Sequence, residues 1–142
     1  MARVKLALPE KFSFKTEIAL RISDINYGGH LGNDSVLSLA HEARLRCMND
    51  AGFSGELDCG GAGTIMTDSV IVYKKQGYYG DIVEVQVAVC DFSNLGCDFM
   101  YLITNKKTGE ELARVKTGIV FYDYKIGKVV TVPDVFRKAF AE

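Results

Sequence analysis

A single helix-like segment, followed only by strand-like segments, is the feature that most limits the folds open to this chain. Between residues 35 and 50 the apolar side chains recur at helical spacing and form one broad stripe, and Gly52 follows as a natural end for a helix. Ala40 and Ala43 within the stripe are small enough to let a sheet approach closely. Five runs with the spacing of strands surround this segment, one before it and four after it: residues 12–22, 64–74, 82–92, 97–104 and 110–124.

The lack of strand–helix alternation after residue 50 indicates an α+β fold with an antiparallel sheet. We expect the four later strands to form a meander, with the sheet partly wrapped around the helix. A smaller extension at residues 126–132 ends at Pro133, and residues 135–140 have the pattern of a short terminal helix. A chain of 142 residues suits one core, so residues 1–142 are predicted to form one domain.

The run at residues 82–92 predicts apolar side chains on both faces of its strand. Four alternating valines between Val83 and Val89 share one face, whereas Cys90 and Phe92 point to the other face. One helix covers only one face of a sheet. We therefore expect an oligomer that buries part of the second face.

Composition excludes several classes of partner. Lys and Arg number 17 and Asp and Glu number 18, so the net charge is near −1 and neither nucleic acid nor an anionic membrane surface is a predicted partner. The chain has no apolar run near the roughly 18 residues of a membrane span, and residues 1–10 lack a signal-peptide pattern, so a cytoplasmic location is expected. The four cysteines have neither CxxC nor metal-site spacing, so we expect free thiols and no metal.

Polar, protonatable and glycine residues crowd into residues 24–34, where a strand must turn into the helix. A helix N-terminus presents unpaired N–H groups and partial positive charge, which can stabilise an oxygen that gains negative charge. His30 is interpreted either as a contact to a substrate carbonyl or as a residue that ties its turn together. Asp24 either bonds loop N–H groups or binds substrate, and Asn33 and Asp34 are helix caps or substrate contacts.

Several charged residues outside that junction have two interpretations. Glu42 lies beside the apolar stripe and is either an exposed glutamate or a base in a cleft between subunits. Arg44 falls inside the apolar sector, which favours a buried ion pair. Lys74 and Lys75, like the pair at 106–107, are surface lysines or contacts to a phosphate.

Common catalytic motifs fail in this sequence. Residues 41–42 begin like the zinc motif HExxH, but Leu45 occupies the position of its second histidine. Phosphate-binding loops, dinucleotide fingerprints and the serine elbow GxSxG are also missing. No cofactor is therefore predicted.

Three spaced motifs resemble those of hotdog-fold thioesterases of the 4-hydroxybenzoyl-CoA thioesterase type. Many members carry D-x-D-x-x-G-H-[VL]-N-N before the helix, and here the stretch reads Asp24-x-Asn26-x-x-Gly29-His30-Leu31-Gly32-Asn33. The helix carries Glu42-Ala43-Arg44 where the family has E-x-A-R. Residues 73–81 are similar to the family connection Y-x-x-P-x-x-x-G-D, with Gln76 in the place of proline.

The resemblance implies a fold, a substrate and an assembly. A curved antiparallel sheet would wrap the long helix, and two subunits would join their sheets edge to edge, giving a homodimer or a homotetramer with active sites at the dimer interface. The substrate would be a thioester of CoA or of acyl carrier protein, hydrolysed without a metal or redox cofactor. Backbone N–H groups near Gly29 to Leu31, or at the helix start, would hold the oxyanion. Independently of the resemblance, the aromatic Tyr27 either lines a substrate pocket or packs in the core.

One departure from the family changes the predicted mechanism. Asn26 occupies the position of a carboxylate that is catalytic in several members, and an amide cannot take a proton from water. Asn26 could instead orient a water or donate to the thioester carbonyl. Glu42 is the first candidate for the base, followed by Asp34 and His30.

Two alternative functions remain at this point. The substitution at Asn26 also suits a protein that binds acyl thioesters without hydrolysing them. A hotdog-fold hydratase or dehydratase that acts on 3-hydroxyacyl or enoyl thioesters is less favoured, because its signature motif is not evident in the sequence.

Overall fold

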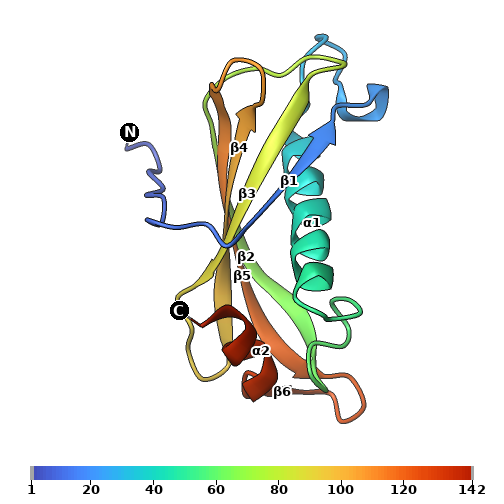
Figure 1. Cartoon of the computed structure of the whole chain (residues 1–142), viewed down its shortest axis with the longest axis vertical. Helices are drawn as coiled ribbons and strands as arrows, with labels where there is room; N and C mark the ends of the chain where they lie inside the picture. The colour runs from blue at the N-terminus through green and yellow to red at the C-terminus, as the bar shows by residue number, and fades with distance from the viewer. Residues whose placement is uncertain (1, 142) are drawn as a thin grey trace.

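The computed structural model describes residues 2–141 and places one antiparallel sheet along a long helix (Figure 1). A sheet wrapped around one helix is the hotdog fold, which the resemblance implied, and it agrees with the α+β class that the sequence pattern predicted. The helices are α1 (Asn33–Asp50) and α2 (Asp134–Phe140), with a short 3₁₀ turn at Ile22–Asp24. The strands are β1 (Phe14–Ala19), β2 (Gly63–Tyr73), β3 (Ile82–Cys90), β4 (Gly96–Asn105), β5 (Glu111–Asp123) and β6 (Lys128–Val130).

The predicted meander is correct only in part. Strands β3, β4 and β5 are consecutive neighbours, but β2 pairs with β5 and the order across the sheet is β1-β3-β4-β5-β2. Strand β1 already occupies the other edge of β3, so β2 joins the sheet at its far side. The extension predicted at residues 126–132 is also different, because a turn separates β6 from β5 and lets it pair back antiparallel.

Helix α1 begins two residues earlier than predicted. Its N-cap is Gly32, which makes no side-chain capping bond, so Asn33 and Asp34 are not caps but the first two residues of the helix. A residue outside the helix fixes the cap position, because the Gly32 amide donates to the carbonyl of Asp24 at 2.9 Å. Gly52, with φ of 96°, follows the C-terminal end and stops the helix as predicted.

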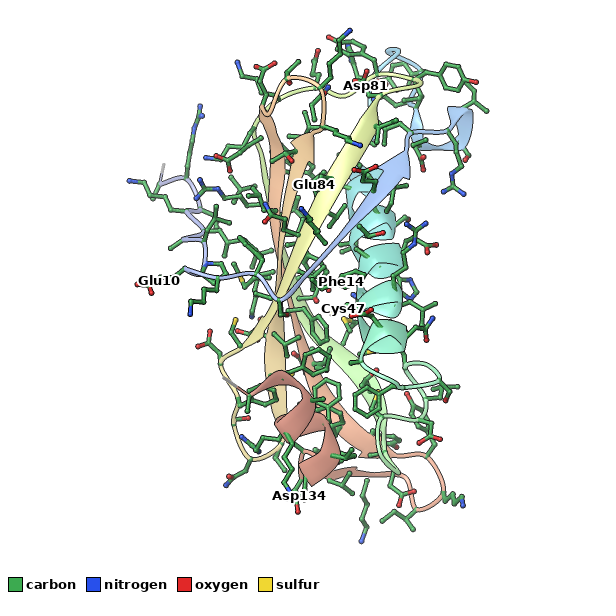
Figure 2. All side chains as sticks on the ribbon, in the orientation of Figure 1. Glu10, Phe14, Cys47, Asp81, Glu84 and Asp134 are labelled. Carbon is green, nitrogen blue, oxygen red and sulfur yellow. The ribbon has the colours of Figure 1, made fainter. Side chains whose placement is uncertain are left out.

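The core lies between α1 and the concave face of the sheet. The alternating valines of β3 face α1, and Val83, Val85 and Val87 are fully buried. Cys47 lies between α1 and the sheet (Figure 2), and Ala40 and Ala43 are also fully buried. The small residues of the stripe therefore allow the close packing that the sequence indicated.

Helix α2 closes one end of this core with a cluster of aromatic rings. Phe136 is fully buried and packs on Phe121 with ring centroids 4.8 Å apart. Phe92 joins the same cluster, so the prediction that it lies on the outer face is wrong. The reason is Asp91, whose φ of 52° reverses the alternation of β3 just before Phe92.

The outer face of the sheet is partly covered by the chain's own N-terminal segment, which lies on the side away from α1 (Figure 1). Arg114 of β5 donates from Nη1 to the carbonyl of Leu6 at 3.0 Å and ties this segment to the sheet. Over residues 2–141, no helix combines the length and the apolar character needed to cross a bilayer.

Candidate active site

Backbone hydrogen bonds hold the junction between β1 and α1 against the link from β2 to β3. Besides the bond from Gly32 to Asp24, the Leu31 amide donates to the carbonyl of Gly77 at 2.7 Å. A Cβ atom on Gly77 would lie 3.0 Å from Leu20 and 3.3 Å from Leu31, so only glycine permits this approach without movement of its neighbours. The start of α1 is therefore fixed by two segments that are distant in the sequence.

Asp24 has the surroundings of a structural residue. It is buried, and its Oδ2 accepts a hydrogen bond from the Arg21 amide at 2.8 Å. The Arg21 side chain also pairs with this carboxylate at 3.4 Å. These contacts fit the interpretation that Asp24 bonds its own loop.

Asn26 organises the glycine turn before the helix. Its Oδ1 accepts hydrogen bonds from the amides of Gly28 at 2.9 Å and His30 at 3.3 Å. Gly29 has φ of 84°, a conformation that the turn requires and that favours glycine. The Oδ1 atom of Asn26 is thus used by the turn, whereas its Nδ2 group has no acceptor in the described part of the chain.

His30 faces the first of three relevant cavities, which we call the junction hollow. The imidazole lies edge-on to Tyr78 with ring centroids 5.5 Å apart. The hollow has a volume of about 210 Å³, and its lining includes Asn26, His30, Leu31, Asn33, Lys75 and Gln76. Tyr27, in contrast, is fully exposed and lines none of the cavities described here.

The backbone donors of this region divide into two groups. The amides of Gly29, His30 and Leu31 are bonded to Asn26 or Gly77, so they are not free to bind an oxyanion as predicted. At the helix start, the amides of Asn33 and Asp34 precede the first intrahelical bonds and have no acceptor among residues 2–141. The donors that remain for a substrate oxygen are therefore the first two of α1.

A second cavity, the helix hollow, lies between α1, β2 and β5. Its volume is about 370 Å³, and Asp34, Ser38 and His41 line it from α1. Glu56 contributes from the loop after the helix, and Ser69 contributes from β2. The structure thus brings Asp34 together with a histidine that the sequence had connected only with a failed zinc motif.

Glu42 lies apart from both hollows. Its carboxylate accepts a hydrogen bond from Arg46 at 2.8 Å, and Arg46 in turn donates to Thr16 and to the carbonyl of Glu17 on β1. The cavity that Glu42 lines is on the β1 side of α1 and does not contain His30 or Asp34. Its role as the base stays a prediction, and the structure does not bring it to the other candidate residues.

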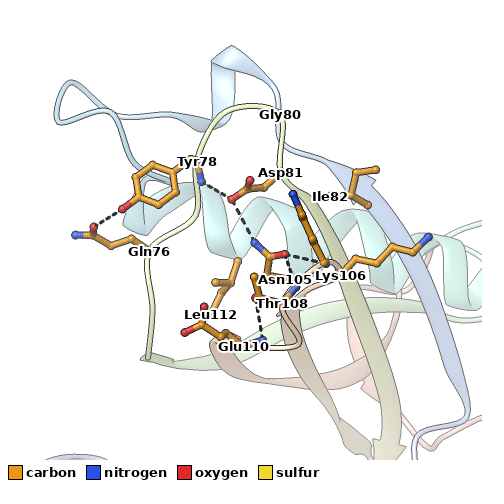
Figure 3. A pocket seen from close by; sticks show the side chains of 11 residues that line it. Gln76, Tyr78, Gly80, Asp81, Ile82, Asn105, Lys106, Thr108, Glu110 and Leu112 are labelled. Carbon is orange, nitrogen blue, oxygen red and sulfur yellow. Dashed lines mark hydrogen bonds between the residues drawn. The ribbon is translucent and has the colours of Figure 1, made fainter.

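A third cavity, of about 800 Å³, lies at the end of the sheet beside the β4–β5 hairpin (Figure 3). Lys106 and Lys107 line it, and Lys106 also pairs with Glu17 at 2.7 Å. Gln76 and Leu112 line both this cavity and the junction hollow, so the two are adjacent. Lys74 is exposed and lines neither of them.

The four cysteines of the chain have surroundings that disfavour thiolate chemistry. Burial raises the pKa of Cys47 and of Cys59 to about 12 and that of Cys90 to about 11, and it also raises the pKa of Cys97. These thiols are therefore protonated near neutral pH and are poor nucleophiles. The described residues contain no group of three His, Cys, Asp or Glu side chains placed to hold a metal ion.

A comparison with models of known protein families shows which superfamily the chain belongs to. Residues 20–140 match the family described as the thioesterase-like superfamily. The chain belongs to this superfamily. A search of curated proteins gives no match to it.

Solved structures of thioesterases have the same fold. Slr0204, a 1,4-dihydroxy-2-naphthoyl-CoA thioesterase from Synechocystis, is 18% identical with a TM-score of 0.81, over 91% of this chain and 96% of that one. DHNA-CoA thioesterase from Staphylococcus aureus is 26% identical with a TM-score of 0.78, over 89% and 87% of the two chains. The 12:0-ACP thioesterase from Umbellularia californica is 22% identical with a TM-score of 0.77, over 91% of this chain and 54% of that one.

These comparisons confirm the resemblance to hotdog-fold thioesterases. Membership of the superfamily supports thioester hydrolysis, the activity predicted from the sequence. The residues that would carry out the reaction are not identified by the comparisons, so their roles rest on the geometry of this chain.

This thioesterase-like chain contains a polar network that connects the core to the helix hollow. Arg44 is buried and pairs with Glu56, Nε to Oε1, at 2.8 Å, which confirms the predicted buried ion pair. Its Nη1 donates to the hydroxyl of Tyr101 at 3.0 Å, and that hydroxyl lies 2.8 Å from Oγ1 of Thr117. The other carboxylate oxygen of Glu56 lies 3.2 Å from Nε2 of His41.

Sequence patterns missed His41 and Glu56 as members of the site. Arg44 was the available signal, because a charged residue in an apolar sector needs a buried partner. The partner comes from a glycine-rich loop 12 residues away, and no helical spacing reveals that contact.

Replacing Tyr101 by phenylalanine should destabilise the fold. Burial raises the pKa of Tyr101, so its hydroxyl stays protonated and can donate to Thr117 while it accepts from Arg44. Tyr101→Phe removes both bonds, and we expect unfolding in urea to require about 1–3 kcal/mol less free energy. Tyr79→Phe, at an exposed tyrosine, is the control, and equal stability of the two variants would contradict this role for the network.

Proposed function

We propose that this chain hydrolyses an acyl thioester carried on a phosphopantetheine arm, the group shared by CoA and acyl carrier protein. The observation that carries the proposal is the pair of free backbone donors, Asn33 and Asp34, at the start of α1 in a member of the thioesterase-like superfamily. One of these residues lines the junction hollow and the other lines the helix hollow. A carbonyl bound at the helix start would therefore be accessible from both hollows.

The helix start supplies the electrostatic part of the mechanism. When water attacks the thioester carbon, the carbonyl oxygen gains negative charge, which the two N–H groups and the positive end of the helix dipole stabilise. Each such donor contributes a rate factor on the order of 10² or more. The arrangement costs no reorganisation, because the bonds of Gly32 and Leu31 already fix the backbone that presents these donors.

Groups on both sides of the helix start can orient the attacking water and transfer protons from the water and to the leaving thiol. In the junction hollow, the Nδ2 group of Asn26 is available to donate to the attacking water or to the carbonyl, as the sequence suggested. His30 and Asp34 remain candidate proton acceptors from the two hollows. Asn26 would therefore orient the water or the carbonyl, at the position where the family has a catalytic carboxylate.

The carrier end of the substrate would occupy the cavity beside the β4–β5 hairpin. Its size suits an extended arm, and it adjoins the junction hollow through Gln76 and Leu112. Lys75 and Lys107 would meet the phosphates along this path.

The active form would be a homodimer that pairs its β2 strands. Strand β2 has 11 residues, lies at one end of the strand order, and has exposed side chains from Ile65 to Ser69. A long free edge with apolar side chains is a template for pairing with another strand. Because Met66 and Ser69 of β2 line the helix hollow, a second copy would complete the wall of the site.

Light scattering on the purified protein checks this assembly. We expect a particle of twice the monomer mass, or of four times that mass if dimers pair. A monomer at micromolar concentration that still turns over substrate would contradict the dimer proposal and leave the reaction itself intact.

Thiol release from a panel of CoA thioesters tests the proposed reaction. The panel should include short, long, branched, hydroxylated and aromatic acyl groups, with an acyl carrier protein thioester beside them. We expect saturable release of thiol from at least one class. Cys47, Cys59 and Cys97 are buried and Cys90 is half-buried, and burial keeps all four protonated near neutral pH, so they should contribute little background to a thiol reagent.

Two results would contradict hydrolysis. Micromolar binding of a thioester without turnover would favour the binding protein, and Asn26 would then explain the loss of catalysis. Loss of enoyl absorbance without thiol release would favour the hydratase.

A further inference from the structure

We infer that Tyr73 is a positioning residue for the proposed oxyanion site, because its hydroxyl orients and polarises the peptide unit that presents the amide of Asp34. This inference rests on the proposed function, since it concerns the free donors at the start of α1. The observation behind it is a hydrogen bond from the Tyr73 hydroxyl to the backbone carbonyl of Asn33, with an oxygen–oxygen distance of 3.0 Å.

Tyr73 reaches the helix start from the sheet. It is the last residue of β2, where it pairs with Ala113 of β5, a fully buried residue of the core. Directly opposed residues of two antiparallel strands point to the same face of a sheet, so the Tyr73 ring lies on the side of α1. Tyr73 and Asn33 also line the junction hollow together. The hydrogen bond therefore ties the end of β2 to the first residue of the helix.

The carbonyl that Tyr73 contacts belongs to the same peptide unit as one of the free donors. A peptide bond joins the carbonyl of Asn33 to the amide of Asp34, and the two groups lie in one plane. A hydrogen bond to this carbonyl therefore restrains the direction of the Asp34 N–H group. It also strengthens that N–H group as a donor, because hydrogen bonds on the two sides of an amide polarise one another. Tyr73 thus acts on the oxyanion through the peptide unit and not by contact with the reacting atoms.

The two donors at the helix start differ in what supports them. The amide of Asn33 shares its peptide unit with the carbonyl of Gly32, which accepts from two backbone amides of the first helical turn at 3.1 and 3.3 Å. Backbone groups therefore support that unit. The carbonyl of Asn33 has two lone pairs, one for the bond within the helix and one for the Tyr73 hydroxyl. The unit that presents the Asp34 amide is thus supported by a side chain that a substitution can remove.

The chain offers a matched control for the loss of the Tyr73 hydroxyl. Tyr73 and Tyr124 are each 53% exposed, and the Tyr124 hydroxyl also donates to a backbone carbonyl of β2, that of Thr64, at 2.9 Å. Thr64 is the second residue of β2 and Tyr73 is the last, so the two bonds lie about 30 Å apart along the strand. Phenylalanine at either position removes one such bond and keeps the ring.

The kinetics of Tyr73→Phe test the inference on a thioester that the wild-type protein hydrolyses. The carbonyl oxygen gains its charge only in the transition state, so a weaker donor should lower kcat and leave KM nearly unchanged. We expect kcat to fall about tenfold, a smaller loss than the roughly 10²-fold or more that removal of a direct donor causes. Tyr124→Phe should keep the wild-type kcat.

Two further readouts separate positioning from direct proton transfer. Tyr73 itself transfers no proton, so Tyr73→Phe should lower kcat by the same factor at every pH and keep the shape of the pH profile. In ¹⁵N NMR spectra, the amide resonance of Asp34 should move in Tyr73→Phe, because this nitrogen senses the hydrogen bond on the carbonyl of its own peptide unit. The amide resonance of Asn33 should move less, and Tyr124→Phe should leave both resonances in place.

Several outcomes would overturn the inference. A kcat of Tyr73→Phe within about twofold of wild type would show that the bond does not serve the reaction. A rise in KM alone would make Tyr73 a contact to the bound substrate, and a changed pH profile would make it a proton donor. An unmoved Asp34 resonance would also contradict polarisation of this peptide unit. Absence of turnover by the wild type would instead overturn the proposed function and the role of Tyr73 in it, whereas the NMR comparison would still report the hydrogen bond.

Discussion

Close packing between α1 and the sheet determines where every other part of this molecule lies. Ala40 and Ala43 are fully buried in the core that α1 shares with β1 and β3, opposite valines that are also fully buried. A larger side chain at either alanine would move the helix away from the sheet. Because the helix is fixed along its length, its start meets the β2–β3 link at Gly77, and its two flanks face different cavities.

The helix therefore defines the candidate site more than any single polar residue does. Its first two amides are free because nothing precedes them in the helix, and the bond from Gly32 to Asp24 holds them in place. The position of Arg44 on α1 also determines its surroundings. Its charge lies on the packed side of the helix, so it needs partners there, and these are Glu56 and Tyr101. Those partners in turn fix the surroundings of His41.

Sequence periodicity was sufficient to predict the strands, the helix and the fold class, because each depends on local burial. It was insufficient to place β2, since an alternating pattern specifies which face of a strand is buried and not which strand is its neighbour. The direction of Phe92 was also missed, because one residue with positive φ, Asp91, reverses the alternation. The resemblance to a thioesterase family supplied the fold that periodicity left open.

Prediction of the site was limited by the same distinction between local and long-range contacts. The spacing of Glu42 placed it beside the apolar stripe, but His41 stands about 100° away on the other flank. Which flank faces the helix hollow depends on the position of β2 and of the loop that carries Glu56, and neither follows from the helix sequence. The turn formed by Asn26 was likewise visible only once its bonds to Gly28 and His30 were known.

The most direct test of the central claim is a crystal structure with an acyl-CoA analogue in which a methylene group replaces the thioester sulfur. Such an analogue keeps the carbonyl and cannot be hydrolysed. We predict that the carbonyl oxygen lies about 3 Å from the backbone nitrogen of Asn33 or Asp34. A carbonyl bound elsewhere, with both of these amides still free, would contradict the role of the helix start.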